Sequence, residues 1–269
     1  MKLSFIKAYL SIFLLLSGPS YAQSKNPGDG KEKKMKAENL EYKFKLGWFT
    51  LGGGSLSFQE NSRIINNDYH HVVKAHAYTD GMAAFFTDMD DDYLSIINSK
   101  SLQPYFSEKH VTIKNGFWDQ WNQFDREKNI IDVKAIKTKK DEKDPRAWKV
   151  NMTDDSYDIV STLVYFMDVN WFRVPKGDTV TIRCHYDKKV YPVCLIYNGI
   201  EKIKFEEDKV SAHRVQIYFP EDRKYTVGRP IFGWMSTDGR NIPLVIQSKM
   251  AFGNARCELT AIDGEDPDF

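Results

Sequence analysis

Apolar and polar residues alternate along most of this chain, which is the pattern of β-strands that bury one face. Near the start of the predicted domain, Tyr42, Phe44 and Leu46 are separated by lysines. Glycines at 52–54 then predict a sharp bend or bulge before the alternation resumes at Leu56. The same pattern predicts further strands over 69–78, 105–113, 118–124, 130–136, 180–186, 190–197, 203–205, 214–219, 231–236, 243–250 and 255–262.

One segment departs from this two-residue period. Apolar residues recur there at helical spacing, at Ile159, Val160, Leu163, Val164 and Met167. Asp154-Asp155-Ser156 offers an N-cap and favourable negative charge at a helix start, so the spacing predicts one helix near 156–168 that packs against a sheet. Many short strands around one helix predict an all-β, mainly antiparallel fold, either a curved sheet, a sandwich or a partly open barrel.

The first 22 residues have the layout of a secretory signal peptide. Lys2 and Lys7 accompany an apolar run over 8–16, and the small residues in Ser20-Tyr21-Ala22 predict cleavage before Gln23. The run is shorter than the roughly 20 residues that span a bilayer, which disfavours the alternative of an uncleaved anchor. We therefore expect export to the periplasm or the outer-membrane periphery, with no transmembrane segment after cleavage.

The rest of the chain is expected to hold one domain between two polar ends. Residues 23–39 are almost free of apolar side chains and are predicted to form a flexible tether. Residues 40–262 are predicted to form a single β-rich domain, and 263–269 an acidic tail. The mostly charged stretch at 138–146 is expected to be an exposed loop. With 38 basic and 37 acidic side chains, the chain has a net charge of +1, which is too small to attract nucleic acid, so no nucleic-acid partner is expected.

Several separated motifs resemble one uncharacterised bacterial envelope family, domain of unknown function 3108. The similar segments are Tyr42-x-Phe44-x-Leu46-Gly47-Trp48, Leu56-x-Phe58, residues 158–166, Lys176-Gly177-Asp178-Thr179, and Trp234-x-Ser236-x-Asp238-x-Arg240-x-Ile242-Pro243 before Lys249-x-x-x-Gly253. The resemblance covers about residues 41–262 and implies a periplasmic or outer-membrane-associated β-rich protein. It implies no catalytic residues. The cysteines and the charged stretch at 138–146 depart from the family pattern.

The three cysteines lie in the second half of the predicted domain. Cys184 and Cys194 flank a predicted hairpin tip at 187–189, and a three-residue turn would place them opposite each other. Either a disulfide or two free thiols is compatible with the sequence, since exported proteins can keep disulfides. Cys257 is expected to be a small buried apolar residue. A zinc site that recruits His185 lacks a fourth ligand, so no metal site is expected.

Local motifs for catalysis are also missing from the sequence. Asp88, Asp90 and Asp92 have the opening spacing of a calcium loop, but Tyr93 and Ser99 occupy the positions that need glycine and glutamate, so a solvated turn is expected. The chain has no Gly-x-Ser-x-Gly elbow for a serine nucleophile. We expect no cofactor, and binding is favoured over enzymatic activity, which stays open.

A candidate binding surface lies in the predicted strand 118–124. Alternation places Trp118 and Gln120 on one face and Trp121 on the other. An exposed indole beside an amide suits a sugar ring or an acyl chain, whereas cross-strand packing is the competing interpretation. We name Trp118, Gln120 and Trp121 as hypothetical ligand-binding residues.

Three functions follow from these expectations. The preferred one is non-catalytic binding of a lipid-like or glycan component of the envelope. The first alternative is a hydrolase or lyase that acts on polysaccharide, since a pair of carboxylates can assemble in space without a local motif. The second is a structural or assembly partner of other envelope proteins, for which the lysine-rich tether would provide reach.

Overall fold

The computed structural model describes residues 31–35, 38–86, 88–113, 115–140, 142–219, 230–250 and 253–269. The predicted signal peptide lies outside these residues. The strands in chain order are β1 (Asn39–Leu46), β2 (Phe49–Ile65), β3 (Asp68–Thr79), β4 (Asp90–Asn98), β5 (Pro104–Ile113), β6 (Gly116–Asp125), β7 (Ile130–Lys139), β8 (Glu142–Asn151), β9 (Ser156–Tyr157), β10 (Thr179–Tyr186), β11 (Lys189–Phe205), β12 (Asp208–Tyr218), β13 (Ile231–Ser236), β14 (Pro243–Met250) and β15 (Gly253–Ile262). The helices are α2 (Gly81–Phe86), α3 (Ile159–Asp168) and the short 3₁₀ turn η1 (Trp171–Arg173).

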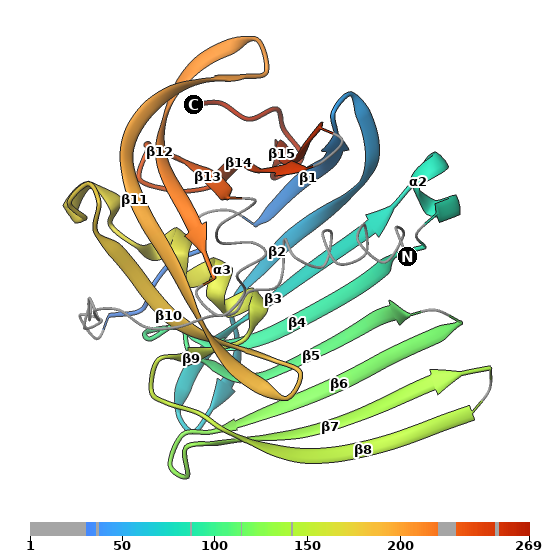
Figure 1. The fold of residues 1–269 in the computed structure, drawn as a ribbon. Helices are drawn as coiled ribbons and strands as arrows, with labels where there is room; N and C mark the ends of the chain where they lie inside the picture. Colours follow the sequence, from blue (N-terminus) through green and yellow to red (C-terminus); the bar gives the residue numbers. More distant parts are fainter. Residues whose placement is uncertain are drawn as a thin grey trace.

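All of these strands belong to one curved sheet that wraps around α3 (Figure 1). The order is β8-β7-β6-β5-β4-β3-β2-β1-β15-β14-β13-β12-β11-β10-β9, so the first and last long strands of the chain pair at the centre. Neighbouring strands are antiparallel, except that β9 runs parallel to β10. The predicted all-β fold with a curved, open sheet and one packed helix is confirmed. No helix in the part of the chain that the structure describes is both long and apolar enough to span a membrane.

The helix α3 lies inside the curve and its apolar side chains join the main core. Val160, Val164 and Met167 are each at most 4% exposed, and they pack with residues from strands on both halves of the sheet. The helix begins three residues later than the sequence predicts. Ser156 and Tyr157 pair instead with Arg183 and Cys184 as the edge strand β9, which a local pattern cannot anticipate because the partner strand lies far along the chain.

Two segments predicted to be irregular are strands. The charged stretch at 138–146 contains the end of β7 and the first half of β8. In the β7–β8 ladder, Ile130 lies opposite Asn151 at one end and Lys139 lies opposite Glu142 at the other. The prediction of a loop is wrong there because β8 is an edge strand, where exposed charged side chains and Pro145 are tolerated. Asp90 and Asp92 likewise belong to β4 and not to a solvated turn.

The sequence leaves open whether Cys184 and Cys194 form a disulfide, and in this structure they do not. The hairpin turns over Asp187 and Lys188 alone, so Cys184 lies opposite Tyr191 and Cys194 lies opposite Thr181. The two thiols are therefore offset along the ladder and point to opposite faces of the sheet, since facing alternates with each residue. All three cysteines are free and buried, as expected for Cys257.

The glycine-rich segment of β2 contains the bulge that the sequence predicts. The register shifts between Phe44 and Lys45, where Phe44 faces Gly52 and Lys45 faces Thr50. Gly52 has a φ of +151°, and a Cβ there would lie 2.0 Å from the carbonyl oxygen of Tyr78. Only glycine allows β2 and β3 to approach this closely.

The ends of the described domain contact its body. The backbone N–H of Lys33 donates to the carbonyl of Ser99 at 2.7 Å. Asp263 Oδ1 accepts from the backbone N–H groups of Glu38 (2.7 Å) and Asn39 (2.6 Å). Residues 23–30 lie outside the described part of the chain, so the division into tether, domain and tail stays a prediction.

Candidate ligand-binding site

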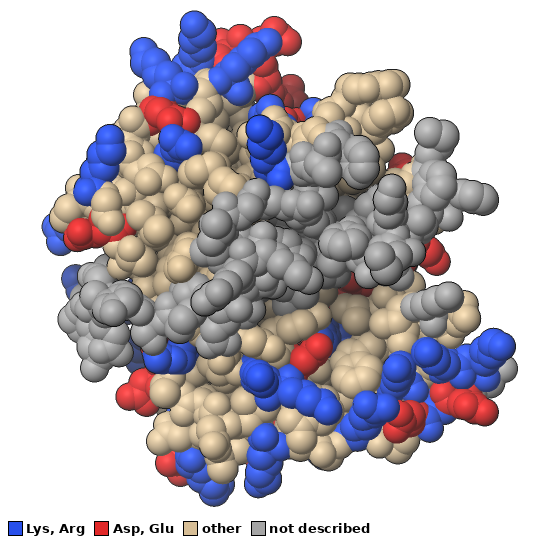
Figure 2. All heavy atoms as spheres, viewed as in Figure 1, with Lys and Arg blue, Asp and Glu red and all other residues tan. Residues whose placement is uncertain are grey.

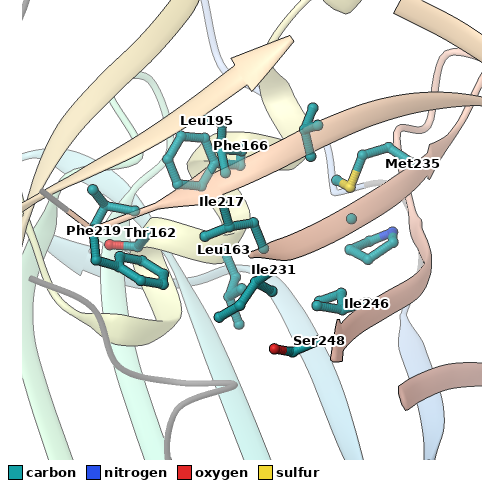
Figure 3. Close-up of a pocket in the computed structure, with 14 residues that line it drawn as sticks. Thr162, Leu163, Phe166, Leu195, Ile217, Phe219, Ile231, Met235, Ile246 and Ser248 are labelled. Carbon is teal, nitrogen blue, oxygen red and sulfur yellow. The ribbon is translucent and has the colours of Figure 1, made fainter. Parts of the chain in front are cut away.

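Two apolar cavities lie next to each other between α3 and the sheet. Cavity 1, of about 70 Å³, is bounded by α3 and strands β11 to β14, as Figure 3 shows. Cavity 2, of about 80 Å³, is bounded by α3 and strands β1, β2, β3, β14 and β15. Each exceeds the roughly 10–15 Å³ that one water molecule needs. Both are lined by Leu163, Pro243 and Ile246, so they meet beneath the same turn of the helix.

Alternation along the strands directs the lining side chains into these cavities. In cavity 1 they include Phe166, Ile217, Ile231 and Met235. The glycine at 233 in β13 adds space, because a Cβ at that position would already lie 3.2 Å from a methyl group of Val215. In cavity 2 the lining includes Tyr42, Phe44, Leu56, Ala75, Met167 and Cys257.

The position of α3 is set by hydrogen bonds at both ends. Asp158 Oδ1 accepts from the backbone N–H of Val160 (2.8 Å) and Ser161 (3.2 Å), which caps the helix. Its second oxygen accepts from the hydroxyls of Ser95 (2.6 Å) and Ser161 (2.8 Å). At the other end, Asn241 Nδ2 donates to the carbonyls of Met167 and Val169. These contacts hold Leu163, which is half-buried, over the junction of the cavities.

The electrostatics of both cavities favour neutral groups. Among the described residues, no Lys, Arg, Asp or Glu side chain lines either cavity. His76 lines cavity 2, but its Nδ1 lies 2.9 Å from Asp92 at the exposed side. Figure 2 shows basic and acidic side chains interspersed on the outer surface around neutral areas. An isolated charge would be strongly unfavourable inside either cavity.

Few polar atoms reach the interior of cavity 1. The hydroxyls of Thr162 and Ser248 both line it. Thr162 lies near the thiol of Cys184, whose pKa burial raises to about 12, but Thr162 Oγ1 has no hydrogen-bond partner among the described residues. Ser248 is 3% exposed, and its Oγ has no hydrogen-bond partner.

The residues predicted for binding lie elsewhere on the sheet, and the structure does not bring all three together. Trp118 Nε1 donates to Gln120 Oε1 at 3.1 Å on the concave face of β6. Gln120 is only 1% exposed and donates in turn to Asn122 at 2.8 Å. Trp121 lines an open depression on the opposite face, together with residues of β7 and β8. The facing predicted by alternation is confirmed, and ligand binding by these residues stays a prediction.

A second group of buried polar residues lies beside Gln120 and Asn122, under the tip of the β10–β11 hairpin. Lys109 forms an ion pair with Asp187, and its Nζ lies 4.2 Å from the centre of the Tyr186 ring. Burial lowers the pKa of Lys109, and it lowers the pKa of His185 to about 4. The space among these side chains measures about 20 Å³, so side chains fill most of this region. Within the described residues, no three His, Cys, Asp or Glu side chains are grouped to hold a metal ion.

Sequence reasoning missed the cavities entirely. Leu163 and Ile246 were expected only as members of a helix face and a strand, and such positions carry no local signal that distinguishes a filled core from a cavity. Ser248 could have been noted as a polar residue at an inward position of a predicted strand, because it follows Ile246 by two residues.

Comparisons with known proteins extend this description. A family model described as "Protein of unknown function (DUF3108)" matches residues 41–260. The chain is similar in structure to a β-barrel-like protein of domain of unknown function DUF1849 from Brucella abortus, with a TM-score of 0.52 and 9% identity over 88% of this chain and 100% of that chain. This likeness shows a shared fold.

Two further solved structures are more distant. A hypothetical protein from Chlamydia trachomatis gives a TM-score of 0.31 at 10% identity, over 86% of this chain and 93% of that chain. The lipoprotein LppX from Mycobacterium tuberculosis gives 0.25 at 8% identity, over 86% and 89%. These similarities are too low to carry an argument. A comparison with curated proteins found no match.

Proposed function

We propose that this chain, which belongs to the DUF3108 family of proteins of unknown function, binds a lipid-like ligand without catalysing a reaction. The observation that carries the proposal is the pair of adjoining apolar cavities under α3, which share Leu163, Pro243 and Ile246 and have no charged lining among the described residues. Concave, mostly apolar sites with few polar groups are typical of small-molecule binding.

The physical basis of binding is removal of methylene groups from water. Each methylene that enters an apolar cavity contributes about 0.8 kcal/mol, or about a fourfold change in affinity. Affinity should therefore rise steadily with chain length until the cavities are full. Leu163 faces both cavities from a single helix turn, so one ligand can displace or flank this side chain and occupy both.

Displacement of a fluorescent alkyl probe from the purified protein tests the proposal. Linear alcohols from hexanol to hexadecanol should displace the probe with affinities that increase with length and then level off. Leu163→Trp should weaken binding at least tenfold by filling the junction, and Gly233→Leu should lower the length at which affinity levels off.

A matched control is Ile64→Trp, because Ile64 is 66% exposed and lies outside both cavities. This variant should bind as wild type does. Absence of alkyl binding by the folded wild type, or equal binding by the Leu163→Trp and Ile64→Trp variants, would contradict the proposal.

The proposal includes a place of action, the periplasm or the periphery of the outer membrane. The charged start, short apolar run and small residues before Gln23 support it. Fractionation of cells, with N-terminal sequencing of the recovered protein, tests this part separately. A cytosolic protein that begins at Met1 would contradict it.

A further inference from the structure

We infer that cavity 1 selects a chain that carries a neutral oxygen, and that the hydroxyl of Ser248 binds this oxygen. The inference rests on the proposed function and names the chemical class of its ligand: a long-chain ester or alcohol. It starts from one buried polar atom that nothing in the described protein satisfies.

The Ser248 hydroxyl is both buried and unpaired. The side chain is 3% exposed, and Oγ lacks a hydrogen-bond partner among the described residues. A buried hydroxyl without a partner is unfavourable, and most such groups in folded proteins are satisfied. Ser99 Oγ shares this condition but lines neither cavity, whereas Thr162 Oγ1 shares it and lines cavity 1 near the Cys184 thiol. The location of Ser248 in cavity 1 is the second observation that supports the inference.

The hydroxyl lies where a ligand would pass. Ser248 faces Ile231 across the β13–β14 ladder and follows Ile246 by two residues, so its side chain shares the inward face. Figure 3 shows it beside Ile231 and Ile246, below Leu163, in a lining that is mostly hydrocarbon. Ile246 belongs to both cavities, so a chain that occupies the junction lies next to Ser248.

The chemistry of the surroundings limits what the hydroxyl can bind. A serine hydroxyl donates one hydrogen bond and accepts others, so it can pair with an ester carbonyl or with another hydroxyl. A carboxylate would need a compensating positive charge, and no basic side chain among the described residues lines the cavity. Thr162 Oγ1, the other hydroxyl that lines the cavity, also lacks a hydrogen-bond partner among the described residues, but it lies near the Cys184 thiol and affects the pKa of that thiol. Ser248 has no such polar neighbour among the residues that line the cavity, so Ser248 is the group that recognises the oxygen.

The test compares decane, methyl decanoate and decanoate as competitors of an alkyl probe on the wild type and two variants. Ser248→Ala should weaken binding of methyl decanoate about fivefold and leave the affinity for decane unchanged. Ser99→Ala is the matched control, because Ser99 Oγ is also buried and unpaired but lines neither cavity, and it should leave both affinities unchanged. The wild type should bind methyl decanoate more tightly than decanoate at neutral pH.

Thermal unfolding adds a readout that does not depend on ligand. Ser248→Ala removes no hydrogen bond within the described protein, so its Tm without ligand should equal or exceed that of wild type. A lower Tm, equal weakening of ester and decane, or tighter binding of decanoate would overturn the inference while the proposed function stands. If the wild type binds none of the three ligands, the proposed function itself fails, and this inference fails with it.

Discussion

Replacement of Asp158 by alanine should be one of the most destabilising single changes in this protein. Asp158 is 5% exposed and caps α3, and its two oxygens accept four hydrogen bonds, two from backbone N–H groups and two from serine hydroxyls. Loss of an N-cap costs about 1 kcal/mol. Each buried donor left without an acceptor adds about 1–3 kcal/mol before relaxation. Since the freed hydroxyls can rotate toward other acceptors, we expect a total loss of about 4 kcal/mol.

Urea unfolding followed by circular dichroism measures this loss. Asp158→Asn keeps one carbonyl oxygen for the cap but cannot accept from both serines, so it should lose about half as much free energy. Asp154→Ala is the control, because Asp154 is exposed and its side chain does not cap the helix, and its unfolding free energy should stay within about 0.5 kcal/mol of wild type. An Asp158→Ala loss below about 1 kcal/mol would refute the reasoning.

The same residue has a distinct dependence on pH. Burial is the largest influence on Asp158 and raises its pKa, while the hydrogen bonds from Ser95 and Ser161 lower it in part. The folded state therefore binds this proton more tightly than the unfolded state, whose pKa is about 3.9. The contribution of Asp158 to stability should decline as pH rises from that value through the raised pKa, and then stay level. The difference in unfolding free energy between wild type and Asp158→Asn should follow this decline, and a difference that grows with pH would contradict it.

Three further predictions concern other parts of the sheet. Burial lowers the pKa of His185 to about 4, so as pH falls this histidine is protonated in the unfolded state before it is protonated in the folded state. The free energy of unfolding should therefore fall by about 3 kcal/mol as pH drops from about 6.5 to about 4. His185→Phe should remove this part of the dependence of unfolding free energy on pH, and an unchanged dependence in that variant would contradict the prediction. Without reductant, a thiol-reactive dye should label no cysteine in the folded protein, because all three are buried, and it should label Cys184, Cys194 and Cys257 once the protein is unfolded. Labelling of only one thiol after unfolding would show that the other two form a disulfide. Gly52→Ala should destabilise the protein by more than about 2 kcal/mol, because a Cβ would overlap the neighbouring strand; a melting temperature equal to that of wild type would show that the strands can separate locally without cost.

The local elements of this fold follow from the sequence because their causes are local. A strand that buries one face needs alternation of adjacent residues, which is visible at Tyr42, Phe44 and Leu46. The helix near 156–168 needs a cap and apolar residues spaced by three and four, both of which are present in the sequence. The bulge at Gly52 follows from the conformational freedom of glycine. The edge strand β8 escaped prediction because an edge position allows charges and a proline that local patterns assign to loops.

Register and cavities were decided by the tertiary structure. Cys184 and Cys194 fail to meet because the register of the hairpin places Cys184 opposite Tyr191, three residues from Cys194, and the length of the turn is invisible in the hydrophobic pattern. Likewise, Leu163 and Ile246 have the sequence character of ordinary core residues. A cavity forms where side chains from α3 and distant strands fail to fill the space between them, so its existence, and the unpaired hydroxyl of Ser248 within it, depend on packing across the whole sheet.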